Sequence, residues 1–126
     1  MSLALTLDPG HGSSLYQQLV DQIATAIYGG RLGPGEQLPS VREVARTTKV
    51  NPLTVAKAYA ELEQRALVTT QWGKGTFVAA NRPAARDVDG HLDACIDRFL
   101  VDALPLVDDP KELLERITRR MRSRKA

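Results

Sequence analysis

The spacing of apolar residues changes twice along the first half of the chain. In residues 3–7 every second residue is a leucine, which predicts a half-buried β-strand. From Ser14 the apolar spacing becomes three or four residues, and Ser14 with Gln17 matches a capping box, so a helix is expected to begin there. This helix should end at the glycine pair 29–30, because the prolines and glycines of residues 31–40 predict a loop.

Two more helices are predicted directly after that loop. Residues 40–43 match another capping box and open a short helix that should end near Thr47. Asn51 then supplies an N-cap, and Pro52 takes the first position of the next helix. One face of this third helix is apolar and is predicted to be buried, and it consists of Val55, Ala58, Tyr59 and Leu62. The opposite face is free to meet a ligand, and it carries Leu53, Lys57, Ala60 and Gln64.

The apolar period returns to two after the third helix. Residues 67–70 and 76–78 read as short strands, and the glycine-rich stretch 72–75 predicts a turn between them. The expected product is a β-hairpin with a basic tip. The expected fold class is therefore α+β and mainly α, with three helices and a small antiparallel sheet in residues 1–80, followed by two C-terminal helices.

The rest of the chain divides into a polar stretch and two helical patterns. Residues 81–90 are polar and contain a proline, which predicts a linker. Residues 91–126 carry two apolar stripes of helical spacing that are separated by Pro105 and Pro110, so a tail of two helices is expected. Two amphipathic helices of this length cannot bury both stripes against each other, which implies a partner surface. The candidate dimerisation residues are Leu92, Ile96, Phe99, Leu100, Ala103, Leu104, Leu113, Leu114, Ile117 and Met121.

Composition excludes some classes of protein. The 126 residues are 43% apolar and 25% charged, without an apolar run near the roughly 18 residues that a membrane span needs. The first residues lack the basic start of a secretory signal, so a cytoplasmic protein that does not bind membranes is expected. The chain is also too short for a large two-lobed enzyme. Its single cysteine, Cys95, lies in an apolar stretch and is expected to be a buried thiol.

Charge is unevenly distributed, although the net charge is only +2. Residues 81–115 carry nine acidic and four basic residues, whereas residues 116–126 carry six basic residues and no acidic one. The basic end invites a nucleic-acid interpretation. We favour the alternative that it is the solvated face of a dimerisation helix, paired with acidic residues of the same tail or of a partner.

The order of the predicted elements is that of a winged helix-turn-helix, in which the helix after Asn51 reads DNA. Some winged helices bind proteins instead, but that function would predict an apolar or acidic exposed face on residues 51–65. Four stretches closely resemble the GntR family of bacterial transcription regulators, and the resemblance covers residues 3–80. They are LYQQL at 15–19, GRLGPGEQLPSVRE at 30–43, NPLTV at 51–55 and GKGTFV at 73–78.

The length of the tail indicates which subfamily of the GntR family the chain resembles. The 46 residues after the hairpin are too few for the large effector domains of other subfamilies, and the chain is similar to the YtrA-type subfamily, whose two-helix tail serves dimerisation. The resemblance implies a homodimer that binds a pseudo-palindromic operator in double-stranded DNA and represses transcription. It also implies a small-molecule effector that releases the DNA, although the short tail leaves little room for a buried pocket.

The resemblance places candidate DNA contacts on the second helix. The family has a DNA-contacting arginine that matches Arg42, the third residue from Ser40, and a guanidinium suits both phosphate and guanine. A solvated surface arginine is the alternative. Arg46 and Lys49 flank the predicted turn and fit contacts to phosphate, as they would fit any solvated face. Ser40 is included as a candidate because it begins the same helix.

Further candidates lie at the start of the reading helix, where side chains meet base edges and backbone amides meet phosphate. Asn51 is expected to act first as the helix cap. Thr54 fits a hydrogen bond to phosphate, and Lys57 lies on the same exposed side. Leu53 fits contact with a thymine methyl group, although an exposed leucine needs no special explanation.

The hairpin supplies the last candidates. Gly73, Lys74 and Gly75 would let the backbone approach the minor groove, with the lysine at the tip. Trp72 departs from the polar or basic residue that the family resemblance leads us to expect before this glycine pair. Its ring either stacks on a sugar or packs under the hairpin, and we favour packing.

Catalysis has no support in the sequence. His11 and His91 are isolated, and the chain contains none of the zinc-protease, nucleophile-elbow, phosphate-loop or paired-cysteine motifs. We therefore expect no enzyme activity, no catalytic residue, no metal site and no cofactor.

Overall fold

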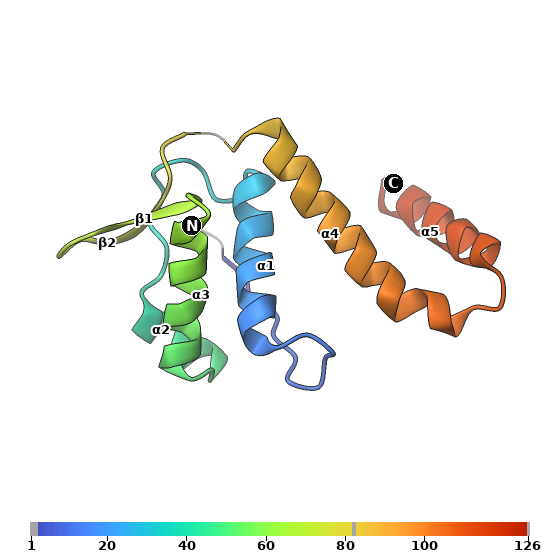
Figure 1. Ribbon diagram of the computed structural model, residues 1–126, viewed down its shortest axis with the longest axis horizontal. Coiled ribbons are helices and arrows are strands. Elements are labelled where there is room, and N and C mark those ends of the chain that lie inside the picture. The colour runs from blue at the N-terminus through green and yellow to red at the C-terminus, as the bar shows by residue number, and fades with distance from the viewer. Residues whose placement is uncertain (1–2, 82, 126) are drawn as a thin grey trace. The chain divides into compact units, whose positions relative to one another are not determined.

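The computed structural model describes residues 3–81 and 83–125, which form two compact units divided between Ala84 and Ala85 (Figure 1). The described part is mainly helical with one two-stranded antiparallel sheet, so the predicted fold class is confirmed. The first unit contains α1 (Leu15–Tyr28), α2 (Val41–Thr48), α3 (Pro52–Gln64), β1 (Val68–Gln71) and β2 (Gly75–Val78). The second unit contains α4 (Ala85–Ala103), the short 3₁₀ helix η1 (Leu104–Leu106) and α5 (Pro110–Lys125).

The first unit, which we call the winged unit, has a single apolar core. Helix α1 lies beside α3, and the side chains between them are almost completely buried (Figure 1). The apolar face predicted for α3 is the buried one. The loop before α2 adds Leu32 and Leu38, which are 1% and 3% exposed. Helices, loop and hairpin therefore share one core, which fixes their relative positions.

Side-chain caps set the starts of these helices. Ser14 Oγ accepts a hydrogen bond from the Gln17 amide at 3.1 Å, and Ser40 Oγ accepts one from the Glu43 amide at 3.0 Å. Asn51 Oδ1 accepts a hydrogen bond from the Leu53 amide at 2.8 Å. Each cap satisfies an amide that the first helical turn leaves unpaired. The three predicted helix starts are confirmed, and the helix predicted to end near Thr47 ends one residue later.

The strand predicted for residues 3–7 is wrong, although its alternation of burial is correct. Leu3, Leu5 and Leu7 are half-buried against the core, but this segment pairs with no strand. Its backbone is bound by a side chain of α1 instead. The Thr6 amide donates to Gln22 Oε1 at 2.9 Å, and Gln22 Nε2 donates to the Thr6 carbonyl at 2.6 Å. A glutamine amide offers the same donor and acceptor pair as a neighbouring strand.

The hairpin, which we call the wing, is held by the loop that precedes α2. Strands β1 and β2 pair in an antiparallel register that joins Val68 to Val78 and Gln71 to Gly75. The loop pairs with the outer edge of β2, because the Leu38 amide donates to the Thr76 carbonyl at 2.8 Å. The Val78 amide donates to the carbonyl of Glu36 in the same loop, also at 2.8 Å. Both edges of β2 are therefore occupied at its base.

The second unit, which we call the tail, differs from the prediction at its start. Helix α4 begins at Ala85, so the second half of the stretch predicted as a linker (residues 81–90) is helical. The predicted break between the two tail helices is confirmed, because α4 ends at Ala103 and α5 begins at Pro110. None of the helices in the described residues is long and apolar enough to cross a membrane.

Candidate nucleic-acid interface

The start of α3 presents the side chains that the core does not use. Leu53 is 72% exposed, Lys57 is exposed and Thr54 is half-buried. Asn51 is exposed too, but its side-chain oxygen is already bound to the Leu53 amide, as expected for a cap. This end of α3 therefore offers a cation, a hydroxyl and an apolar surface, next to the partial positive charge of a helix N-terminus.

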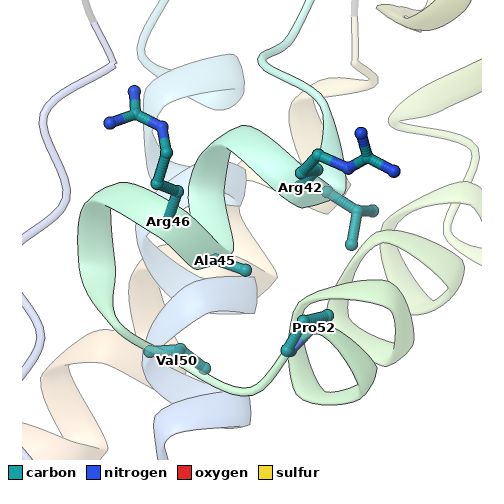
Figure 2. Close-up of a pocket in the computed structure, with 6 residues that line it drawn as sticks. Arg42, Ala45, Arg46, Val50 and Pro52 are labelled. Atoms are coloured by element: carbon teal, nitrogen blue, oxygen red, sulfur yellow. The ribbon is translucent and has the colours of Figure 1, made fainter.

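Two arginines border a shallow groove between α2 and the start of α3. The groove has a volume of about 670 Å³, and it is lined by Val41, Arg42, Ala45, Arg46, Val50 and Pro52. Figure 2 shows the side chains of Arg42 and Arg46 extending from the same side of α2, away from Val50 and Pro52. Both guanidinium groups are thus presented outward, where an anion can reach them.

Arg46 has an intramolecular partner. Its Nη2 atom lies 2.7 Å from Glu43 Oε1, and the two side chains are 68% and 50% exposed. An exposed ion pair of this kind contributes less than about 1 kcal/mol, because water and salt screen it. The pair therefore orients Arg46 without preventing the guanidinium from exchanging the carboxylate for a phosphate.

The turn between α2 and α3 contains a residue in the left-handed region. Lys49, the C-cap of α2, has φ 60° and ψ 30° and is exposed, while its neighbour Val50 is buried. A non-glycine residue adopts this conformation at some energetic cost. The sequence predicts Lys49 beside the turn, whereas in the structure it is the residue at which the chain reverses.

The wing presents Trp72 to solvent, and this corrects the prediction that the ring packs under the hairpin. Trp72 is 97% exposed, because the strands end at Gln71 and Gly75 and leave it in the connecting turn. Gly73 and Gly75 have φ values of +73° and +124°, which side chains rarely adopt. Lys74 lies between them and is exposed, so the predicted basic tip is confirmed.

A buried tyrosine that the sequence analysis assigned only to the core also links α3 to the start of α2. The Tyr59 hydroxyl donates a hydrogen bond to the carbonyl of Pro39, which directly precedes the cap residue Ser40. Burial raises the pKa of Tyr59 above its ordinary value, so the phenol stays neutral and remains a donor. This bond fixes the base of α2, and hence of Arg42, relative to α3. No spacing rule in the sequence predicts it.

The titratable groups of the described residues form no cluster that could bind a metal ion. In the tail, Cys95 Sγ lies 3.7 Å from His91 Nε2. Cys95 is half-buried, whereas the sequence predicted a fully buried thiol.

The residues of the candidate interface lie in a stretch that matches a known protein family. The model of the bacterial regulatory proteins of the gntR family matches residues 15–78, which run from the start of α1 to the end of the wing. The chain belongs to the GntR family. The match covers all three helices of the winged unit and both strands, so the family resemblance of the sequence is confirmed.

Two curated relatives from Bacillus subtilis strain 168 place the chain within this GntR family. The uncharacterized regulator YhcF is 48% identical over 104 residues, which cover 82% of this chain and 86% of YhcF. The transcriptional repressor YtrA is 39% identical over 77 residues, which cover 61% of this chain and 59% of YtrA. The match thus spans less than two thirds of the YtrA repressor but most of YhcF.

Two solved structures of GntR-type regulators match as well. The YtrA protein of Sulfolobus acidocaldarius, a GntR-family transcription factor, has a TM-score of 0.56 at 30% identity, covering 96% of this chain and 99% of that one. The DNA-binding domain of AraR in complex with operator ORE1 has a TM-score of 0.52 at 28% identity, covering 60% of this chain and 93% of that domain. The chain is therefore a YtrA-like GntR regulator with a DNA-binding domain, and its family comprises transcription regulators, not enzymes.

Proposed function

We propose that this GntR-family protein is a repressor that binds a pseudo-palindromic operator as a homodimer. The observation that carries the proposal is the surface at the start of α3, where Leu53 and Lys57 are exposed, together with Arg42, which lines the groove between α2 and this helix start. A helix N-terminus with such neighbours suits the major groove, because bases and phosphates can both be reached from it. The similar DNA-binding domain of AraR is in complex with operator ORE1, which supports DNA binding by the winged unit of this chain.

The proposed DNA contacts come from three elements. Arg42 donates to guanine or to phosphate, Arg46 and Lys49 contact phosphates, and Leu53 packs on a thymine methyl group. Thr54 and Lys57 bind the sugar–phosphate backbone of the DNA beside the reading helix. The full set is Ser40, Arg42, Arg46, Lys49, Asn51, Leu53, Thr54, Lys57, Trp72, Gly73, Lys74 and Gly75.

The tail is the proposed dimerisation region. Among its described residues only Leu113 is buried among the large apolar side chains, whereas Leu92, Ile96 and Phe99 are between 45% and 55% exposed. A continuous apolar stripe of this kind is stabilised when a second copy covers it. Two-fold symmetry would then place two reading helices on successive major grooves of one operator.

Repression, the cytoplasmic location and an effector are the remaining parts of the proposal. The relative YtrA is named a transcriptional repressor, and a bound dimer would block access of polymerase to a promoter. A regulator of this kind acts in the cytoplasm, where the chromosome is. A small molecule that weakens DNA binding would relieve repression; its identity is not proposed.

DNA binding is tested with a duplex from the region upstream of the protein's own gene and with a scrambled duplex, at several salt concentrations. We expect Arg42→Ala to weaken binding of the upstream duplex by about tenfold or more, because a paired contact is lost. We expect Lys57→Ala to lower the salt dependence by the equivalent of about one phosphate contact. Arg31→Ala is the matched control, because it removes an exposed cation outside α2, α3 and the wing.

Equal binding of the upstream and scrambled duplexes would leave a distant operator to be tested by selection of bound genomic fragments. A selection that enriches no sequence would contradict the proposal. Dimerisation is tested separately by sedimentation equilibrium. We expect a dimer at micromolar concentration and a monomer for Phe99→Asp, and a monomeric wild-type protein would contradict the role given to the tail.

A further inference from the structure

The tip of the wing carries an exposed aromatic side chain on a braced support. Trp72 is 97% exposed, and among the described residues of the winged unit the only other exposed large apolar side chain is Leu53. A single exposed apolar residue is common on protein surfaces and by itself indicates nothing. Trp72 differs from such a residue in two ways: hydrogen bonds hold the turn that carries it, and the wing around it is positively charged.

The turn that carries Trp72 is braced from two sides. The Lys74 amide donates to the Gln71 carbonyl at 3.0 Å, which closes the turn around Trp72. Gln37 Nε2, from the loop before α2, donates to the Lys74 carbonyl at 3.0 Å. A Cβ atom at Gly75 would lie 2.7 Å from Gln37 Nε2, so this glycine makes the brace possible. A ring on a braced turn loses less conformational freedom on binding than a ring on a mobile loop.

The charge of the wing fits a polyanion. Lys74 is the only charged residue between positions 66 and 81. The carboxylate of Glu63 in α3 reaches β1, where its Oε2 accepts a hydrogen bond from the Thr70 amide at 3.1 Å. The exposed residues before Trp72 are Thr69, Thr70 and Gln71, which are uncharged hydrogen-bonding side chains. A protein-docking surface would instead surround the tryptophan with further apolar area. The wing therefore favours DNA over a protein partner.

From this arrangement we propose that Trp72 is a minor-groove wedge that bends the operator beside each half-site; the inference rests on the proposed DNA binding. The indole packs against sugars and base edges and partly opens one base step, while Lys74 neutralises a neighbouring phosphate. Pyrimidine–purine steps such as TA and CA open most easily. Trp72 thereby makes the protein select flexible steps at the edges of its operator, in addition to the bases read by α3.

The first test uses the intrinsic fluorescence of the protein, since Trp72 is the only tryptophan of the chain. The upstream duplex, or the duplex enriched from genomic fragments, is added to the wild-type protein, and binding is followed in parallel by the anisotropy of labelled DNA. We expect the tryptophan emission to be quenched and to move to shorter wavelength, with saturation at the same duplex concentration as the anisotropy. Stacking between the ring and the DNA produces both changes.

The second test measures DNA bending with circularly permuted fragments. We expect Trp72→Ala to abolish most of the bend and to weaken binding about tenfold, in the range of a lost aromatic–base contact. Trp72→Phe should retain a partial bend. Leu106→Ala is the matched control, because it removes an apolar side chain that is 84% exposed and lies outside the proposed DNA-binding and dimerisation residues, so the bend should be unchanged. Unchanged circular dichroism and thermal unfolding of Trp72→Ala would show that it folds normally, as its exposure predicts.

The outcomes separate the wedge from DNA binding itself. Preferential binding of the duplex with unchanged tryptophan emission would overturn the wedge and leave the regulator proposal intact. A Trp72→Ala protein that bends DNA and selects flanking TA or CA steps as the wild type does would also overturn it. A wild-type protein that prefers no duplex at all would overturn both.

Discussion

The winged unit and the tail use their apolar residues in opposite ways. Among the described residues of the winged unit, 17 apolar residues form one buried cluster, and eight of the larger ones, including Leu19, Ile23 and Leu62, are completely or almost completely inaccessible. In the tail, Leu113 is the only buried apolar residue among those described. Both units have amphipathic helices, so amphipathicity alone does not distinguish them.

The winged unit thus buries its own apolar residues, whereas the described part of the tail does not. The winged unit closes its core with three helices, a loop and a wing, which is enough for a small domain to fold alone. The tail has about half that length and leaves its apolar stripe in solvent. We therefore expect the stability of the winged unit to be independent of protein concentration, whereas that of the tail depends on a second copy.

The largest effect should come from the core of the winged unit. Leu62→Ala removes a side chain that is 0% exposed, and we expect it to lower the free energy of unfolding by about 3 kcal/mol through lost burial and a cavity. Leu106→Ala in the tail is the matched control, because this leucine is 84% exposed and lies outside the proposed dimerisation residues. Urea unfolding followed by circular dichroism measures both at several protein concentrations. An equal loss for the two variants would break the comparison.

The next effect concerns the tail and should depend on concentration. Phe99 is 45% exposed, and we expect Phe99→Ala to weaken dimerisation by about 1–3 kcal/mol, because a partner would otherwise bury the ring. Sedimentation equilibrium measures the change in the dimer dissociation constant. The unfolding of the winged unit should be unchanged in the same variant, and a loss there would show that the tail stabilises the winged unit directly.

A smaller effect is expected from the hydrogen bond between Tyr59 and Pro39. Tyr59→Phe leaves the carbonyl of the half-buried Pro39 without its donor, and we expect a loss of about 1–2 kcal/mol in chemical unfolding. Burial raises the folded-state pKa of Tyr59 above the unfolded value of about 10. Its contribution is thus complete below about pH 10 and falls as the pH rises beyond that value. The phenylalanine variant should lack this part of the alkaline loss, and an identical pH profile would contradict the role given to the bond.

The smallest effect should come from the cap of α2. Ser40→Ala removes the acceptor for the Glu43 amide, and we expect it to lower the free energy of unfolding by about 1 kcal/mol. Ser123→Ala in α5 serves as the comparison, because Ser123 is exposed and caps no helix. Thermal unfolding of the two variants should differ. A loss as small as that of the control would mean that the start of α2 is held by Tyr59 rather than by its own cap.

Much of the fold could be predicted because its signals are local. A cap such as Asn51 followed by Pro52 acts within one helical turn, so the start of α3 follows from neighbouring residues. The contributions of Gln22, Gln37 and Tyr59 could not be predicted in this way. Each binds backbone atoms between 16 and 37 positions away, and such a partner is chosen by packing rather than by spacing.

Periodicity and short stretches of residues were enough to predict the helices, the buried face of α3, the basic tip of the wing and the family. The pairing of residues 3–7 with a glutamine instead of a strand, and the exposure of Trp72, follow only from the folded structure. Alternating apolar residues indicate which side chains are buried, but they do not indicate which group forms hydrogen bonds with the backbone of the segment. The sequence allows an aromatic residue in a turn to be either buried or exposed. The folded structure decides between the two, because the loop before α2 occupies the outer edge of the wing.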